Sequence, residues 1–169
     1  MRFTLATIAC ALAIAPAAAQ TTGIELPSAL VPAGLSVYLT VPATGVQIYT
    51  CGKNDAGAPT WVFKAPEAQL FDTDKKQIGK HYAGPIWEAL AGGKVVGAAK
   101  ASAPAAEAGA VPWLLLDIKS SEGSGVFNQA KAIQRIHTHG GVAPAQGCDA
   151  AHAGQEARVP YTATYLFLK

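Results

Sequence analysis

The segment RVPYTATYLFLK (158–169) decides the fold class of this chain. Its apolar and aromatic side chains stand at every second position: Val159, Tyr161, Ala163, Tyr165 and Phe167. Successive side chains of a β-strand point to opposite faces, so this period of two predicts a strand with one buried face. The same period recurs toward the N-terminus, and no segment has the longer period of a long helix.

Further strand candidates are separated by Gly, Pro, Asn and Asp. They are LSVYLTV (35–41), GVQIYTC (45–51), PTWVFKA (59–65), EAQLFD (67–72), a segment over 77–82, PIWEAL (85–90), KVVGAAKAS (94–102), PWLLLDIKS (112–120) and QRIHTH (134–139). The turn-forming residues 42–45 predict a hairpin between the first two. About ten short strands with frequent turns predict an all-β, single-domain sandwich or barrel.

The N-terminus has the pattern of an export signal. Arg2 precedes an apolar run over 5–14, and Ala17-Ala18-Ala19 fits the small-residue cleavage pattern. We therefore expect a signal peptide over 1–19 with cleavage near Ala19, an extended segment over 20–34 and one β-rich domain over 35–169. The expected location is periplasmic or secreted.

Charge excludes some partners. Removing Arg2 leaves twelve Lys and Arg residues against eleven Asp and Glu, a net charge of +1. A balanced chain without a basic cluster gives no electrostatic reason to expect nucleic acid as a partner. No apolar run reaches the roughly 20 residues of a membrane span. The sequence leaves the oligomeric state open.

Two cysteines, Cys51 and Cys148, remain after the signal segment with Cys10 is removed. In an oxidising compartment an isolated pair forms one disulfide, and the spacing is not that of a C-x-x-C redox site. The bond would close a loop of about 98 residues and add at most roughly 4–5 kcal/mol of stability.

His137 and His139 form an H-x-H pair that could offer two nitrogen ligands to Zn²⁺ or Cu²⁺. No third ligand is visible in the sequence, and Arg135 nearby would oppose a cation. The alternative is a pair of solvent-facing histidines at the end of a strand.

The segment HYAGPIWEA (81–89) gathers the other candidates. His81, Tyr82, Trp87 and Glu88 could form the lip of a binding site, with the tryptophan as a stacking surface. His81 and Glu88 are also the candidate acid and base of a hydrolase or isomerase, provided they meet across the Gly84-Pro85 turn. The competing interpretation is a tight corner packed by aromatic rings.

In order and spacing, the motifs GVQIYTC, GKHYAGPIWE, PWLLL, IQRIHTHGGVAP and RVPYTATYLF resemble the DUF3455 family of secreted bacterial and fungal proteins. The resemblance implies a secreted β-rich domain and brings no catalytic residues. It covers Arg135, which joins the binding candidates, whereas His137 and His139 stand where the family usually has other residue types.

Three hypotheses follow from the sequence. The first is an exported domain that binds a small molecule, glycan or surface partner near 81–88. The second is the His81–Glu88 enzyme, and the third is a metal-binding protein using His137 and His139. The nearest approach to a dinucleotide fingerprint, Gly123-x-Gly125, lies in no βαβ unit, so we expect no cofactor.

Overall fold

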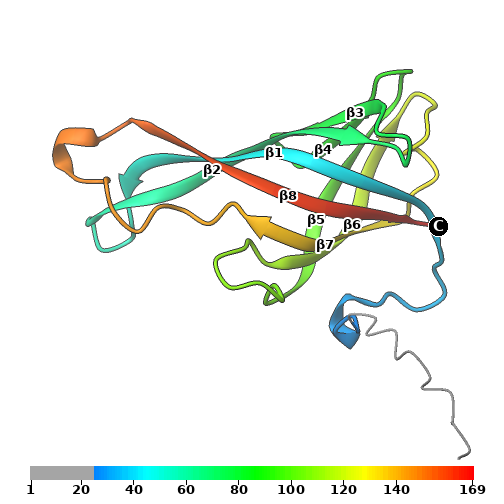
Figure 1. Cartoon of the computed structure of the whole chain (residues 1–169), viewed down its shortest axis with the longest axis horizontal. Coiled ribbons are helices and arrows are strands. Elements are labelled where there is room, and N and C mark those ends of the chain that lie inside the picture. Colours follow the sequence, from blue (N-terminus) through cyan, green and yellow to red (C-terminus); the bar gives the residue numbers. More distant parts are fainter. Residues whose placement is uncertain (1–24) are drawn as a thin grey trace, which may run out of the picture.

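The fold is a closed antiparallel β-barrel of eight strands in chain order (Figure 1). A computed structural model describes residues 25–169. The strands are β1 (Val37–Lys53), β2 (Pro59–Phe71), β3 (Gln77–Tyr82), β4 (Ile86–Ala89), β5 (Lys94–Ala103), β6 (Trp113–Glu122), β7 (Ala132–Gly140) and β8 (Glu156–Leu168); two 3-10 turns are η1 (Ser28–Leu30) and η2 (Ala150–His152). The predicted all-β class is confirmed, and the barrel is the form that the domain takes.

Eight strands replace the ten or so expected, because two pairs of predicted strands are continuous. The expected hairpin at 42–45 is wrong, since β1 runs straight through it and pairs with β8 over Val37–Thr50. Gly45 allows β2 to approach closely, because a Cβ there would lie 2.1 Å from the Glu67 carbonyl oxygen. The predicted segments 59–65 and 67–72 likewise merge into β2, with a β-bulge opposite Ile48 and Tyr49.

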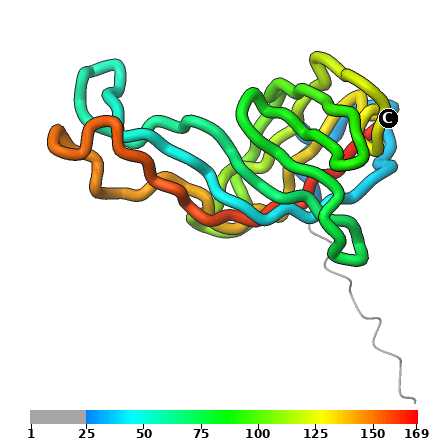
Figure 2. The backbone as a smooth tube through the Cα atoms, turned by 90° about the horizontal axis from the view of Figure 1, so that it is seen from above, coloured from blue at the N-terminus to red at the C-terminus, as the bar shows by residue number. Residues whose placement is uncertain are grey.

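Three of the strands extend beyond the barrel as an arm (Figure 2). The end of β1, the start of β2 and the start of β8 form it, together with the chain between β7 and β8. Its staple is the predicted disulfide, Cys51–Cys148, which is confirmed with an S–S distance of 2.01 Å. Trp61 Nε1 also donates a hydrogen bond to the Gln146 carbonyl oxygen at 2.9 Å. The disulfide therefore joins the chain between β7 and β8 to the end of β1, within the arm.

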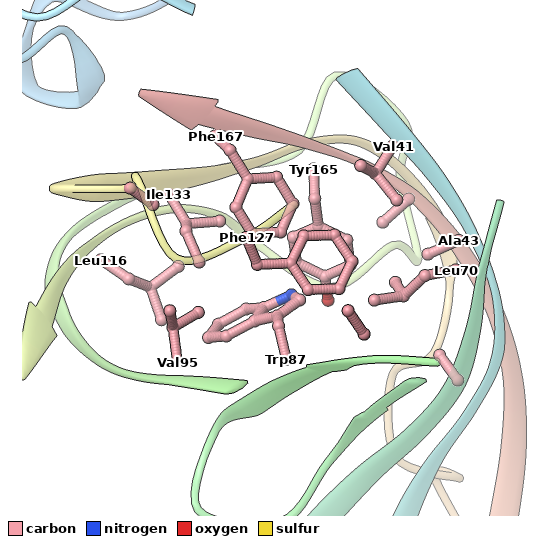
Figure 3. Packing of buried hydrophobic residues seen from close by; sticks show 14 of the residues in the cluster. Val41, Ala43, Leu70, Trp87, Val95, Leu116, Phe127, Ile133, Tyr165 and Phe167 are labelled. Carbon is pink, nitrogen blue, oxygen red and sulfur yellow. The ribbon is translucent and has the colours of Figure 1, made fainter. Parts of the chain in front are cut away.

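Large aromatic and aliphatic side chains fill the barrel (Figure 3). Trp87 packs edge-to-face against Tyr165 and Phe167, with ring centroids 5.5 and 6.5 Å apart. Phe127 stacks on Phe167 with centroids 4.7 Å apart and comes from the loop between β6 and β7, so it plugs the barrel from that end. The alternating residues of β8 that define the fold class, from Tyr161 to Phe167, all belong to this interior cluster.

A second apolar cluster lies on the outside of the barrel, under the segment that precedes β1. Leu30 of η1 is fully buried against Trp113, Leu115 and Ile136. The Gln134 side-chain amide donates to the Leu30 carbonyl oxygen at 2.5 Å. Ser36 and Lys169 then exchange two backbone hydrogen bonds of 3.0 Å, which join the start of β1 to the chain end.

The predicted signal peptide and its cleavage near Ala19 lie outside the described residues. Over 25–169, no helix is long and apolar enough to cross a bilayer.

Candidate functional site

A groove of about 680 Å³ runs across β1, β2, β3 and β4. Its exposed and half-buried lining comes from outward positions of these strands and from β8: Thr44, Glu67, Gln69, Gln77, Lys80, Tyr82, Glu88 and Arg158. Ligand sites commonly measure about 300–1,000 Å³, so the size is suitable for a small molecule. The lining combines these charged, amide and phenol side chains with apolar surface.

Tyr82 and Glu88 form the aromatic and acidic wall of the groove. Strands β3 and β4 pair Lys80 with Glu88, and the Tyr82 hydroxyl donates to Glu88 Oε2 at 2.9 Å. Partial loss of solvent, the hydrogen bond to Glu88 and its negative charge raise the pKa of Tyr82. The hydroxyl is therefore protonated at neutral pH and orients the carboxylate, while the Tyr82 ring remains partly exposed.

Glu67 and Arg158 form an ion pair on the opposite side of the groove, with Arg158 Nη2 2.8 Å from Glu67 Oε1. Both side chains are about half exposed. An ion pair this exposed contributes little to stability, because water screens it. Both groups are accessible to a ligand, and the groove thus offers hydrogen-bond donors and acceptors at both walls.

His81 and Trp87 belong to the barrel interior, where they are 3% and 1% exposed. Their rings stack with centroids 4.3 Å apart and planes 15° apart. His81 Nδ1 lies 2.9 Å from the Ile86 carbonyl oxygen, which can only accept, so Nδ1 carries the proton. Burial lowers the pKa of His81 to about 3. His81 is a neutral core group at physiological pH, although it also borders the groove.

The predicted catalytic pair is not brought together. His81 lies opposite Trp87 in the β3–β4 ladder, whereas Glu88 lies opposite Lys80. Neighbouring positions on a strand face opposite sides, so His81 points inward and Glu88 points outward. Each is hydrogen-bonded elsewhere, His81 to Ile86 and Glu88 to Tyr82. The turn at Gly84-Pro85 sets this register instead of folding the two side chains together.

Arg135 lies on β7, opposite Tyr165 of β8. Its Nε and Nη2 both donate to the Pro112 carbonyl oxygen, at 3.2 and 2.8 Å. None of the ion pairs within 25–169 includes Arg135. Its charge contributes to lowering the pKa of buried His81, after burial. Arg135 is thus separated from the groove and belongs to the barrel wall near Tyr165.

A family model described as "Protein of unknown function (DUF3455)" matches residues 32–169. The chain belongs to the DUF3455 family. No curated protein and no solved structure matches the chain.

In this DUF3455 chain, His137 and His139 are both exposed at a β-bulge of β7, where His137 has a φ of +48°. The His137 and Trp113 rings pack edge-to-face with centroids 5.6 Å apart, and His139 pairs with Glu107. No group of three or more His, Cys, Asp or Glu over 25–169 is arranged to hold a metal ion. The geometry does not favour the metal hypothesis over two surface histidines.

The sequence analysis named three residues that line the groove, His81, Tyr82 and Glu88, and missed the others. Lys80 is two positions from Tyr82 on β3, so the period of two could have placed it on the same face. Glu67 and Arg158 come from strands distant in sequence, and the closed sheet brings them together in the groove as an ion pair. No local signal in the sequence links them.

Proposed function

We propose that this DUF3455 protein is an exported domain that binds a small polar ligand, with a glycan as the best-fitting class, in the groove across β1–β4. The observation that carries the proposal is the groove itself, about 680 Å³ and lined by charged, amide and phenol groups. A sugar presents many hydroxyls, each able to donate and accept, and its C–H faces can pack on an aromatic ring. Tyr82 supplies the ring, and Glu88 and Lys80 supply an acceptor and a donor.

Export is part of the proposal. The sequence pattern of 1–19 is that of a signal peptide. The Cys51–Cys148 disulfide supports an oxidising location such as the periplasm or the extracellular space, because disulfides are rare in reducing compartments. N-terminal sequencing of secreted protein should begin near Gln20, and a mature protein that still begins at Met1 would contradict this part.

Binding is tested on an array of immobilised neutral and acidic oligosaccharides. We expect Tyr82→Ala and Glu88→Gln each to weaken binding to the retained glycans by about fivefold to thirtyfold, since each removes a contact worth roughly 1–2 kcal/mol. Val142→Ala and Asp117→Asn are the controls, because they remove an exposed apolar side chain and an accessible carboxylate outside the groove.

Trp87→Ala is unsuitable as a binding test, because Trp87 is 1% exposed and its loss would open the core. An array that retains no protein at high concentration contradicts a glycan ligand. Equal losses of binding in the groove variants and the two controls contradict the location of the site.

A further inference from the structure

The outer edge of β2 in the arm is an unpaired strand edge. Strand β2 pairs with β3 only from Ala68 onward, so its first part, from Pro59 to Glu67, has a strand on one side alone. Within 25–169, no backbone hydrogen bond from a loop reaches Trp61, Val62 or Phe63 on that side. An exposed strand edge is a template for another strand.

The backbone groups that face this edge can be identified from β1. The Cys51 N–H donates to the Gln155 carbonyl, and the Gly154 N–H donates to the Cys51 carbonyl, both at 2.8 Å. Both backbone groups of Cys51 therefore point away from β2. Trp61 lies opposite Cys51, and opposed residues of an antiparallel ladder exchange both hydrogen bonds or neither. The N–H and C=O groups of Trp61 therefore face the free edge, and those of Phe63 do so two positions further along.

The side chains at this edge are unusually apolar. Val62 is 45% exposed and Phe63 is 53% exposed, on opposite faces of the strand. Lys64 is the only charged residue from Pro59 to Pro66, and it pairs with Glu156 of its own chain. By contrast, the β8 side of the arm carries Glu156, Arg158 and Pro160, residue types that discourage strand addition.

We infer that the β2 edge binds a second copy of this chain, in an antiparallel strand pair centred on Val62. This register places Trp61 opposite Phe63 of the second copy, and the same contact occurs again by symmetry. Both residues have free backbone groups, so the two pairs exchange two hydrogen bonds each. The aromatic side chains meet on one face, the two Val62 side chains meet on the other, and Lys64 faces Thr60, so no like charges oppose.

A copy of the same chain suits this edge because the pattern is self-complementary about Val62. The register shift between β1 and β2 makes Lys64 a bulge residue, so regular backbone pairing is limited to Trp61–Phe63, with Thr60 and Lys64 adjoining at its ends. So short an interface predicts a weak dimer, with a dissociation constant on the order of tens of micromolar.

The oligomeric state of the purified protein is measured by sedimentation velocity from about 1 μM to about 1 mM, a range that spans the expected dissociation constant. We expect a reversible monomer–dimer equilibrium. Val62→Lys should shift it at least about tenfold toward monomer, because it places two like charges at the symmetry axis. Val126→Lys, which changes a valine of 47% exposure outside the arm, should leave it unchanged.

Cysteine cross-linking tests the register even where association is weak. Opposed residues of a non-hydrogen-bonded pair have Cα atoms roughly 4.5 Å apart, within disulfide range. Val62→Cys should therefore form a covalent dimer on mild oxidation, with Cys51–Cys148 intact by peptide mapping. Thr60→Cys and Lys64→Cys should cross-link only when the two variants are mixed. A native protein that remains monomeric at about 1 mM overturns the inference, and so does equal self-linking of Thr60→Cys and Val62→Cys.

Discussion

At the scale of single residues, His81 shows how burial determines what a polar side chain can do. Its sequence context, beside Tyr82 and near Glu88, is that of a candidate catalytic base. Inside the barrel its ring is stacked on Trp87 and one nitrogen is bound to the Ile86 carbonyl. The environment keeps the ring neutral, and the ring packs into the barrel core on Trp87.

His81 makes the fold sensitive to acid. The pKa is about 3 in the folded protein and 6.5 when the side chain is free, so the unfolded chain binds the proton more tightly. The stabilising contribution is complete above about pH 6.5 and is lost as the pH falls toward 3. Urea unfolding should show a His81-dependent loss of about 3 kcal/mol between pH 7 and pH 4.

His81→Phe keeps a ring on Trp87 and removes the titration, so its stability should depend less on pH by that amount. Asp149 and Glu156 have lowered pKa values because of their bonds to His152 and Lys64, and they contribute the same acid sensitivity to both proteins. Parallel pH profiles for the two proteins would contradict the assignment.

At the scale of elements, the strands were predictable but their ends were not. The alternation in β8 is strong because one side of the strand faces the filled interior. Pro42 and Gly45 are residues typical of turns. In the structure both lie within β1: Pro42 comes just before the pairing with β2 begins at Ala43, and Gly45 lets the β2 backbone approach closely. Local residue preference cannot distinguish these uses, since both depend on a strand far away in sequence.

The candidate site was predictable to the same limited extent. Alternation correctly separates Trp87 from Glu88, and it also separates His81 from Glu88 once β3 and β4 pair as a regular hairpin. The register decides this outcome, and register depends on the loop at 83–85. Contributions from β2 and β8 require the closed sheet, which no short segment encodes.

The segment before β1, predicted only as an extended stretch over 20–34, packs on the outside of the barrel through Leu30. Leu30 is fully buried on the outer cluster with Trp113 and Leu115. We expect Leu30→Ala to lower the free energy of unfolding by about 2–4 kcal/mol in urea titrations, because it leaves a cavity. Val31→Ala is the matched control at 55% exposure and should change stability by less than about 0.5 kcal/mol. Equal effects would show that the segment does not cover the barrel.

At the scale of the whole molecule, the barrel and the arm are stabilised differently. A filled aromatic interior supports the barrel, whereas the arm relies on one disulfide and the contacts of its loop. The barrel can therefore remain folded when the arm is loosened.

Replacing both Cys51 and Cys148 by Ala should lower the free energy of unfolding by about 3–5 kcal/mol, since the bond joins residues far apart in sequence. Hydrogen exchange should accelerate first at the amides of Cys51 and Gly154, which bond across the arm. The amide of Tyr165 in the barrel should exchange only on global unfolding. Simultaneous acceleration at all three sites would show that the arm and the barrel unfold together.

The backbone pairing of Ser36 with Lys169 has a practical consequence for anyone who handles this protein. It fixes the last residue at the end of the barrel opposite the arm (Figure 1). A linker attached there would hold the molecule on a sensor chip or bead with the arm directed away from the support. The β2 edge of the arm would then face the flowing solution, so a second copy of the chain could be passed over it as the analyte.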